Sequence, residues 1–562
     1  MARWTVLALL CAGLFACGDD ASSGATEGGT TASGTDVPMG TSATGVDTTT
    51  SAGPTSDPMP GSESDSGSSE TTATDPTGPD VPTIDCDTLA ESIDAESLMA
   101  HLAQLQAIGD AHGNRSVGTP GYVASADYVR ARLQAAGYDT AVDQDFDVTV
   151  FEELSPPSLS ASAPLDDTYA VEEDFVTARY SGSGTVTAPV VPIDINLSGN
   201  NQNNSGCQPE DFDGFPPGAI ALIQRGSCTF VNKVNRAIDN GASGVILFNQ
   251  GGNDNQQDPL SVGIDPDNPD NPPTVFTSYA VGAALAGATG VEATITVDGL
   301  TEVRTTRNVL VERVGTDAEQ VVMFGAHLDS VPAGPGINDN GTGSMALLAI
   351  AERLAQCDPA RTVRFAWWGA EEIGLLGSAH YVQTLADSDR ASLMFYLNFD
   401  MIGSPNFVRF VHDGDGSRYG NAGPEGSDAL EQFFADHFDA LGLPVTEARF
   451  DGRSDYGPFL DAGIPTGGLF TGAEGNKSGQ ETRQYGGTQG EAYDPCYHLA
   501  CDVDGNIAVE EYARVATAVA TAVQRFGIDG EGLFSAYVGP RPLATASAPS
   551  GPAGCGHALT RE

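Results

Sequence analysis

The feature that most constrains the fold is a regular alternation of strand-like and helix-like segments after about Thr301. Short apolar runs typical of buried strands, such as Val321–Phe324 and Thr362–Trp368, are separated by segments whose apolar residues recur at helical spacing. Such alternation is typical of a parallel sheet with helices on both faces. We therefore predict an α/β fold, with a mostly parallel central sheet flanked by helices, for residues 301–530.

The segments on either side of this region differ in character. Residues 86–154 contain two helix-like segments and one alternating, strand-like segment, and we assign them to the N-terminal part of the same domain. Residues 155–300 consist of short β-like runs, loops rich in Asn, Gly and Pro, and one helix-like segment, so we interpret them as a β-rich insertion. Residues 531–562, rich in Ala, Pro and Gly, are predicted to form an irregular C-terminal tail.

Residues 1–17 have the pattern of an export signal. Arg3 precedes an apolar run, Trp4–Phe15, that is too short to span a membrane. The stretch LFAC, ending at Cys17, resembles the lipobox of bacterial lipoproteins, in which the cysteine is acylated; an ordinary secretory signal is the alternative. Residues 18–85 contain no Lys, Arg or aromatic residue and are predicted to be a disordered acidic linker. We therefore expect an outer-membrane or cell-surface lipoprotein, with release from the cell left open.

Charge and cysteine content narrow the function further. The chain has 76 acidic residues against 25 Lys and Arg, and its net charge of −51 repels nucleic acid and anionic membranes. We expect no nucleic-acid partner, membrane attachment only through the lipid anchor, and a monomer. Apart from Cys11 and Cys17, seven of the nine cysteines remain, and none has CxxC spacing. Disulfides are therefore expected in an exported chain, and a cysteine-based zinc site is not.

Polar side chains follow the ends of three predicted strands and recur in one late loop. In a parallel α/β sheet, ligands bind outside the carboxyl ends of the strands. Imidazole and carboxylate ligands without thiolate suit zinc, and a bridging carboxylate suits two ions that share a water. The candidate ligands and bases at this edge are His327, Asp339, Glu371, Glu372, Asp400 and His498.

The motifs that carry these residues resemble those of a two-zinc metallopeptidase family (M28-type) of secreted bacterial and fungal aminopeptidases. The resemblance covers essentially residues 86–527. It implies that His327 in GAHLDS binds one zinc and that Asp329 orients this imidazole without binding the metal itself. It also implies that Asp339 in GINDNGTG bridges both ions, with a cis peptide bond between Asp339 and Asn340.

The same resemblance assigns the later motifs. In GAEEIGLLGS, Glu371 resembles the general base and Glu372 the adjacent zinc ligand. NFDMIG supplies Asp400 and CYHLACD supplies His498 as the remaining ligands. Tyr497 matches a tyrosine that donates to the tetrahedral oxyanion.

Several positions match the family less closely. In GRSDYGPF, Asp455 is implied to orient a ligand histidine, but Tyr456 replaces the usual histidine, which leaves its role open. Arg453 and Glu447 fall where some secreted aminopeptidases contact the substrate, and surface ion pairing is the alternative.

The insertion resembles the protease-associated domain, through its RGSCTF turn, helix and GASGVI strand. A generic β insertion is the alternative. The domain implies a lid or substrate-access role and a Cys207–Cys228 disulfide. A Cys496–Cys501 disulfide would stiffen the loop of His498, and Cys86–Cys357 is a further pairing to test.

These resemblances imply a zinc aminopeptidase with two Zn²⁺ ions that acts on peptide N-termini, where acidic groups suit a cationic amine. A carboxypeptidase or dipeptidase on the same scaffold would need basic groups for a C-terminal carboxylate, and the chain has only two lysines, Lys233 and Lys477. Glutaminyl cyclases share the fold but use one metal. A catalytically inactive surface binding protein is the alternative from another class, and the bound-metal stoichiometry separates it from an enzyme.

Overall fold

The computed structural model describes residues 84–139, 141–198, 203–252 and 256–531 of the 562-residue chain. The predicted signal peptide, Cys17 and almost all of the predicted linker lie outside these residues, as does Cys555 in the predicted tail. Within the described residues, no helix combines the length and apolar character needed to cross a membrane.

The predicted α/β architecture is confirmed by a sheet whose central strands are parallel. Strand β9 pairs in parallel with β10 on one side and β11 on the other, and β11 pairs in parallel with β14. The antiparallel neighbours are β8, beside β10, and β12, beside β14. The strands of this part are β1 (Val142–Ala161), β8 (Glu292–Arg313), β9 (Asp317–His327), β10 (Arg361–Trp368), β11 (Leu393–Asp400), β12 (Phe410–His412), β13 (Thr446–Ala448) and β14 (Thr466–Phe470).

Helices cover both faces of this sheet because its strands are apolar on both sides. On β9, Val322 and Phe324 pack into a core that includes residues of α1, α2, α5 and α11, whereas Val321 and Met323 pack on the opposite face with residues of α6 and α9. This alternation follows from the two-residue period of a strand. The helices are α1 (Ala95–His112), α2 (Pro120–Ala136), α5 (Gly343–Leu354), α6 (Leu376–Thr384), α7 (Asp387–Ser392), α8 (Ser427–Ala440), α9 (Tyr456–Asp461), α10 (Gly479–Tyr485) and α11 (Val509–Ala522).

The insertion has its own core and its own parallel strands. Strands β4, β5, β6 and β7 pair in parallel in that order, and β3 adds an antiparallel edge. The structure contains a second helix, α4, that the sequence did not indicate, because the segment YAVGAALAG is too uniformly apolar to show helical periodicity. The elements are β2 (Asp167–Tyr169), β3 (Phe175–Thr177), β4 (Gly184–Ile193), β5 (Ile220–Gln224), α3 (Phe230–Asp239), β6 (Gly244–Phe248), β7 (Thr274–Thr277) and α4 (Tyr279–Gly287).

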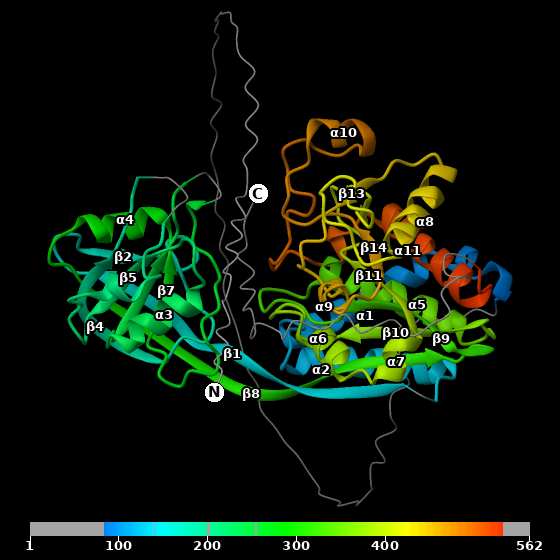
Figure 1. Cartoon of the computed structure of the whole chain (residues 1–562), viewed down its shortest axis with the longest axis horizontal. Helices are drawn as coiled ribbons and strands as arrows, with labels where there is room; N and C mark the ends of the chain where they lie inside the picture. Colours follow the sequence, from blue (N-terminus) through cyan, green and yellow to red (C-terminus); the bar gives the residue numbers. More distant parts are fainter. Residues whose placement is uncertain (1–83, 140, 199–202, 253–255, 532–562) are drawn as a thin grey trace, which may run out of the picture. The chain divides into compact units, whose positions relative to one another are not determined.

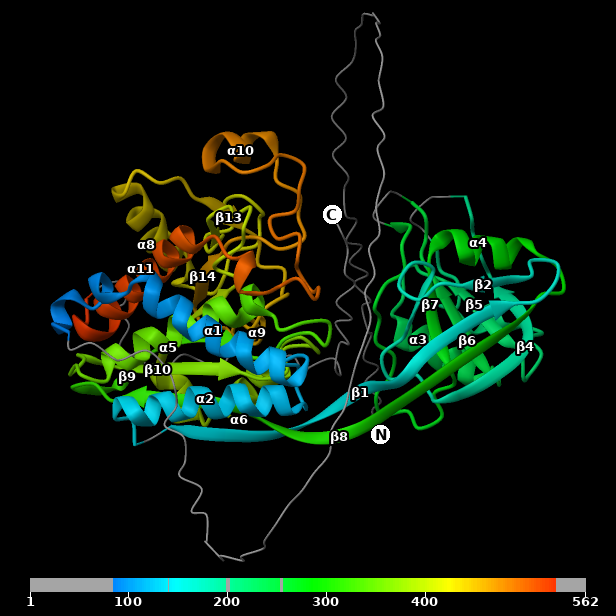
Figure 2. The same cartoon turned by 180° about the vertical axis from the view of Figure 1, so that it is seen from behind.

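Two long strands connect the insertion to the main sheet. Strands β1 and β8 are antiparallel neighbours from Val142–Leu310 to Ala161–Ala293, and they run side by side in Figure 1 and in the reverse view of Figure 2. The domain boundaries predicted at 154/155 and 300/301 therefore fall inside continuous strands. Sequence composition changes there, and the pairing of β1 with β8 shifts register between Glu153 and Ser158, but the ladder continues on both sides of the shift.

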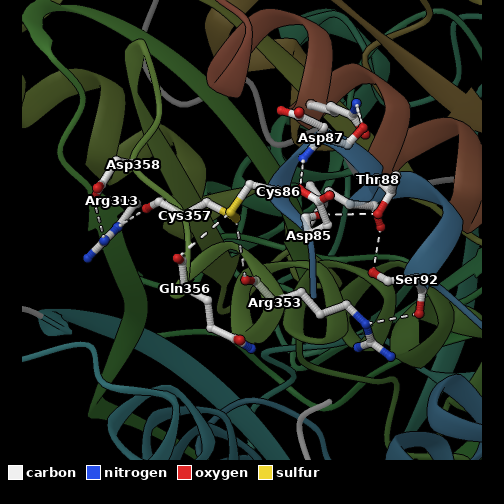
Figure 3. The surroundings of a disulfide bond; sticks show 12 residues. Asp85, Cys86, Asp87, Thr88, Ser92, Arg313, Arg353, Gln356, Cys357 and Asp358 are labelled. Atoms are coloured by element: carbon white, nitrogen blue, oxygen red, sulfur yellow. Dashed lines mark hydrogen bonds and ion pairs between the residues drawn. A yellow bond between two sulfur atoms is a disulfide. The ribbon is translucent and has the colours of Figure 1, made fainter. Parts of the chain in front are cut away.

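Three disulfides lie within the described residues. Cys207–Cys228 in the insertion and Cys496–Cys501 near the site are present, as is Cys86–Cys357. Figure 3 shows that the last of these joins the start of the described chain to the segment just after α5. The Arg313 guanidinium donates to the Cys357 carbonyl, at 2.6 Å, and so ties the same segment to β8.

Candidate active site

The candidate site lies where the parallel strands end. His327 is the last residue of β9 and Asp400 the last of β11. Glu371 and Glu372 follow β10 after two intervening residues, Gly369 and Ala370. Because β9 lies between β10 and β11 in the sheet, these ends meet at one edge. Asp339 comes from the loop before α5, and its peptide bond to Asn340 is cis, as the resemblance implied.

The structure brings the five predicted ligands together in two linked groups. His327 Nε2 lies 3.3 Å from Asp339 Oδ1 and 3.3 Å from Asp400 Oδ1. His498 Nε2 lies 3.2 Å from Asp339 Oδ2 and 3.1 Å from Glu372 Oε2. Asp339 thus presents one oxygen to each imidazole, and each half of the site offers one nitrogen and two carboxylate oxygens.

This donor set fits divalent cations such as zinc. The side chains of His327 and Asp339 are almost fully buried, and Glu372 Oε1 is buried with no hydrogen-bond partner within the described residues. Burial raises the pKa of Glu371 well above its usual range, and the adjacent Glu372 carboxylate raises it further. Carboxylates crowded in this way repel one another unless positive charge lies among them. A zinc ion held by these imidazole and carboxylate groups would supply that charge.

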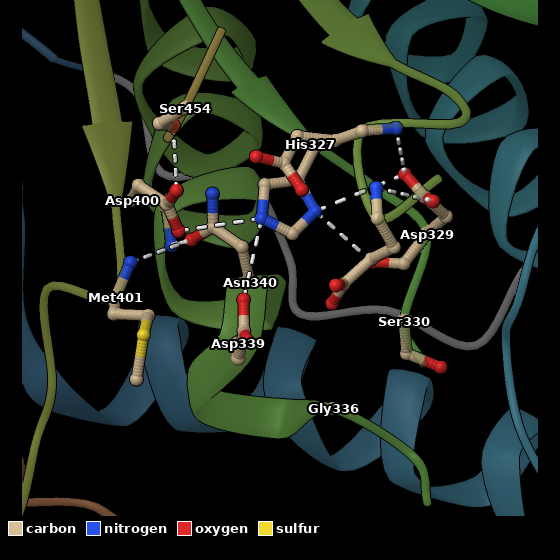
Figure 4. Close-up of polar contacts among 12 residues, drawn as sticks. His327, Asp329, Ser330, Gly336, Asp339, Asn340, Asp400, Met401 and Ser454 are labelled. Atoms are coloured by element: carbon tan, nitrogen blue, oxygen red, sulfur yellow. Dashed lines mark hydrogen bonds and ion pairs between the residues drawn. The ribbon is translucent and has the colours of Figure 1, made fainter. Parts of the chain in front are cut away.

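Hydrogen bonds hold the ligands from behind. Figure 4 shows Asp400 between the imidazole of His327 and Ser454, whose hydroxyl donates to Asp400 Oδ2 at 2.6 Å. The Asp502 carboxylate accepts the backbone N–H groups of Asn338, at 2.7 Å, and Asp339, at 2.9 Å. Sequence reasoning missed Ser454 and Asp502, although both stand beside residues that it singled out.

Asp329 supports the site differently from the expectation. The His327 Nδ1 atom lies 3.1 Å from the backbone oxygen of Asp329 and 3.8 Å from its carboxylate. The carboxylate instead accepts the backbone N–H groups of Glu371, at 3.1 Å, and Glu372, at 3.3 Å. Asp329 therefore positions the two glutamates with its side chain and faces the imidazole with its main chain.

Asp455 and Tyr456 also depart from the family pattern. The Asp455 carboxylate accepts a hydrogen bond from the Ser378 hydroxyl, at 2.5 Å, rather than one from a ligand imidazole. The Tyr456 hydroxyl donates to Asp451 Oδ1 at 2.6 Å and accepts the backbone N–H groups of Asp451 and Gly452. Tyr456 thus anchors the loop that carries Arg453 into the site.

Tyr497 and Arg453 lie together beside the second imidazole. The Tyr497 ring stacks on His498 with centroids 3.8 Å apart, and Arg453 Nη2 lies 3.3 Å from the Tyr497 hydroxyl. Burial raises the pKa of Tyr497 well above its usual range, so this hydroxyl keeps its proton at neutral pH. Arg453 Nη1 also forms an ion pair with Glu474 Oε1, at 2.8 Å.

The proposed ligands, together with Glu371, Tyr497 and Arg453, line a cavity of about 430 Å³. Glu474 lines the cavity, whereas Glu447, the acidic residue that the sequence favoured, does not. Glu447 lies on the edge strand β13, and its neighbours Ala448 and Arg449 face the cavity instead. Much of the remaining wall is aromatic or apolar: Met401, Phe410, Tyr419, Tyr456, Phe470 and Tyr493.

Comparisons with known proteins identify relatives of this chain. Residues 308–523 match the family described as Peptidase family M28, and residues 186–285 match the PA domain. An "Aminopeptidase" of Pseudomonas aeruginosa (strain UCBPP-PA14) is 47% identical over 420 residues, which cover 75% of this chain and 78% of that protein. "Leucine aminopeptidase 2" of Trichophyton tonsurans is 36% identical over 482 residues, covering 85% of this chain and 93% of the relative.

Solved structures of aminopeptidases also superpose on this chain. A zinc aminopeptidase from Bacillus subtilis superposes with a TM-score of 0.57 at 25% identity, over 78% of this chain and 97% of that chain. An aminopeptidase from Aneurinibacillus sp. strain AM-1 superposes with a TM-score of 0.63 over 82% of this chain and 100% of that chain. At 22% identity, the second match supports the fold alone.

Proposed function

Because this chain belongs to peptidase family M28, with an inserted protease-associated (PA) domain, we propose that it is a zinc aminopeptidase that removes residues from the free N-terminus of peptides. The observation that carries the proposal is the placement of Asp339, whose two carboxylate oxygens each face a different histidine. Each histidine also has a second carboxylate beside it. We infer two zinc ions, held by His327, Asp400 and Asp339 on one side and by Glu372, His498 and Asp339 on the other.

The chain's own residues account for the proton transfers. Bound zinc lowers the pKa of water and polarises a carbonyl. Glu371 is the proposed base, because it lies beside the ligand Glu372 and because its raised pKa favours holding a proton that is then passed to the leaving amine. The protonated Tyr497 hydroxyl donates to the oxygen on which negative charge develops.

The charges of the cavity favour an amino group over a carboxylate. Neither lysine lines the cavity: Lys233 lies in the insertion, and the Lys477 ammonium donates to the carbonyl of Phe407 at 2.6 Å. Arg453 does line it, but its charge is paired with Glu474. Arg449 also lines the cavity, and its guanidinium lies over the Tyr419 ring, 5.1 Å from the ring centroid. The acidic side chains of the wall outnumber these two arginines, which favours a cationic amine over a C-terminal carboxylate: Asp339, Glu371, Glu372, Asp400, Asp451 and Glu474. The aromatic walls favour peptides whose first residue is apolar or aromatic.

A substrate panel tests this function directly. Leucine p-nitroanilide should be cleaved, its N-acetylated form should not, and a chelator should abolish turnover that added zinc restores. Cleavage of the N-blocked substrate or of peptides from the C-terminus would contradict the proposal. Zinc analysis of the purified protein should find two ions per chain; one ion would favour the single-metal glutaminyl cyclase alternative.

We also propose export and a lipid anchor at Cys17, for which the LFAC stretch is the support. Replacing Cys17 by Ser should release the protein from membranes or block its maturation. An unchanged mature mass and unchanged detergent partitioning would contradict the anchor without affecting the peptidase proposal.

A further inference from the structure

A second group of acidic side chains lies outside the proposed zinc site. Asp413 and Asp415 are in the loop between β12 and α8, and Glu431 is on α8. One carboxylate oxygen from each lies within 4.8 Å of the others. Asp413 is buried, with 1% of its surface exposed, whereas Asp415 is exposed.

Backbone N–H groups engage only one oxygen of each carboxylate. Asp413 Oδ2 accepts from Arg418 and Tyr419, Glu431 Oε2 accepts from Gly414 and Asp415, and Asp415 Oδ1 accepts from Ser417. Asp413 Oδ1 is buried and has no hydrogen-bond partner within the described residues. A buried carboxylate oxygen of this kind is costly unless a proton or a cation satisfies it.

No positive side chain offsets this cluster. Within the part of the chain that the structure describes, no ion pair involves Asp413, Asp415 or Glu431. Burial raises the pKa of Glu431, and the Asp415 and Asp413 carboxylates raise it further. Hydrogen bonds from Ser417 lower the pKa of Asp415, which keeps this carboxylate charged beside the other two. The repulsion among the three carboxylates is the interaction that a bound cation would relieve.

We propose that Asp413, Asp415 and Glu431 form a Ca²⁺ site. All the available donors are oxygens, with no imidazole or thiolate, which suits a hard cation rather than zinc. The loop DGDGS supplies two carboxylates two residues apart and contains glycines, so that loop carbonyls and water can fill the larger coordination shell that Ca²⁺ takes. With three carboxylates, one of them exposed, we expect a Kd on the order of 10⁻⁴–10⁻³ M, the range of extracellular calcium modules.

The loop connects this site to the active-site cavity. His412 directly precedes Asp413, and Tyr419 donates its N–H to the same carboxylate; both residues line the cavity. Calcium would therefore hold one wall of the substrate cavity in place. We expect calcium to lower KM for peptide substrates about two- to fivefold while kcat changes little, because the base and the zinc ligands lie elsewhere.

The test is a titration of the zinc-loaded, full-length protein with CaCl₂ by isothermal calorimetry, with zinc content measured before and after. We expect one saturable calcium site and, at 10 mM CaCl₂, a Tm higher by about 2 °C. Asp415→Asn should bind calcium at least tenfold more weakly, because it removes a charge from an exposed residue and leaves the buried Asp413 intact. Asp439→Asn is the matched control: it removes one carboxylate charge from α8, about two turns beyond Glu431, and should bind calcium like the unsubstituted protein.

Two results would overturn the site: no saturable calcium binding up to 10 mM, or equal affinity in Asp415→Asn and Asp439→Asn. Equal affinity for Mg²⁺ would also contradict it, since the argument requires a flexible, high-coordination oxygen site. Glu431→Gln provides a second variant with the same expected weakening. Binding is measured without substrate, so its failure leaves the peptidase proposal standing.

Discussion

The two adjacent glutamates allow proton transfer to be separated from metal binding. Glu372 Oε2 lies 3.1 Å from His498 Nε2, within a proposed ligand group, whereas Glu371 places a carboxylate oxygen within 4.8 Å of ligand atoms of His327 and Asp400, on the other side of the site. The backbone N–H groups of Glu371 and Glu372 both donate to the Asp329 carboxylate. Glu371→Gln keeps the shape of the side chain and leaves these backbone bonds unchanged, but it cannot accept a proton.

The expected loss follows from the role assigned to Glu371. General-base catalysis is typically worth about 10²–10⁴-fold, so kcat of Glu371→Gln should fall by that factor, or about 3–5 kcal/mol in the barrier. KM should change little, since the substituted group acts on the proton rather than on the bound peptide. The assay is steady-state hydrolysis of leucine p-nitroanilide, with zinc content determined on the same preparation.

Glu372→Gln is the matched control, with the same chemical change one residue later. It should lower zinc affinity, and added zinc should restore part of its turnover. Near-normal kcat in Glu371→Gln would refute its role as the base. Loss of zinc from Glu371→Gln, with zinc retained in Glu372→Gln, would show that the two roles are reversed.

Three further predictions concern neighbouring groups. Burial lowers the pKa of His412 to about 4, whereas a histidine in the unfolded chain has a pKa near 6.5. Between pH 6.5 and pH 4 the unfolded state therefore binds more protons than the folded state, and the free energy of unfolding falls by up to about 3 kcal/mol as the pH is lowered. His412→Phe should lose less Tm between pH 7 and pH 4.5; an equal loss would contradict this. Replacing Cys496 and Cys501 together by Ser should free the loop of His498 and speed zinc loss to a chelator, and an unchanged rate would refute it. Glu474→Gln leaves Arg453 unpaired and should raise KM for substrates with a free amine, an expectation that fails if KM is unchanged.

Local pattern was enough to predict the architecture and the proposed ligands. Apolar runs and their spacing depend on near neighbours, so β9, β10 and β11 could be recognised from periodicity alone. His327, Glu371 and Asp400 stand at or just after strand ends, and parallel strands collect their carboxyl ends at one edge. The motifs around these residues then implied a role for each.

Partners distant in the sequence were decided only by the tertiary structure. Asp455 bonds to Ser378, 77 residues away, instead of to an imidazole, and the acidic partner of Arg453 is Glu474 rather than Glu447. No local pattern distinguishes these outcomes, because each depends on how separate loops pack over the sheet.

The domain boundaries are a further example. Composition changes near residues 154 and 300, yet β1 and β8 continue through both positions as one antiparallel pair. Composition reports burial and turn content along the chain, whereas a strand ends where its hydrogen-bonded partner ends. Periodicity along one segment therefore determines what that segment becomes, and the contacts among segments determine which side chains meet and what each can do.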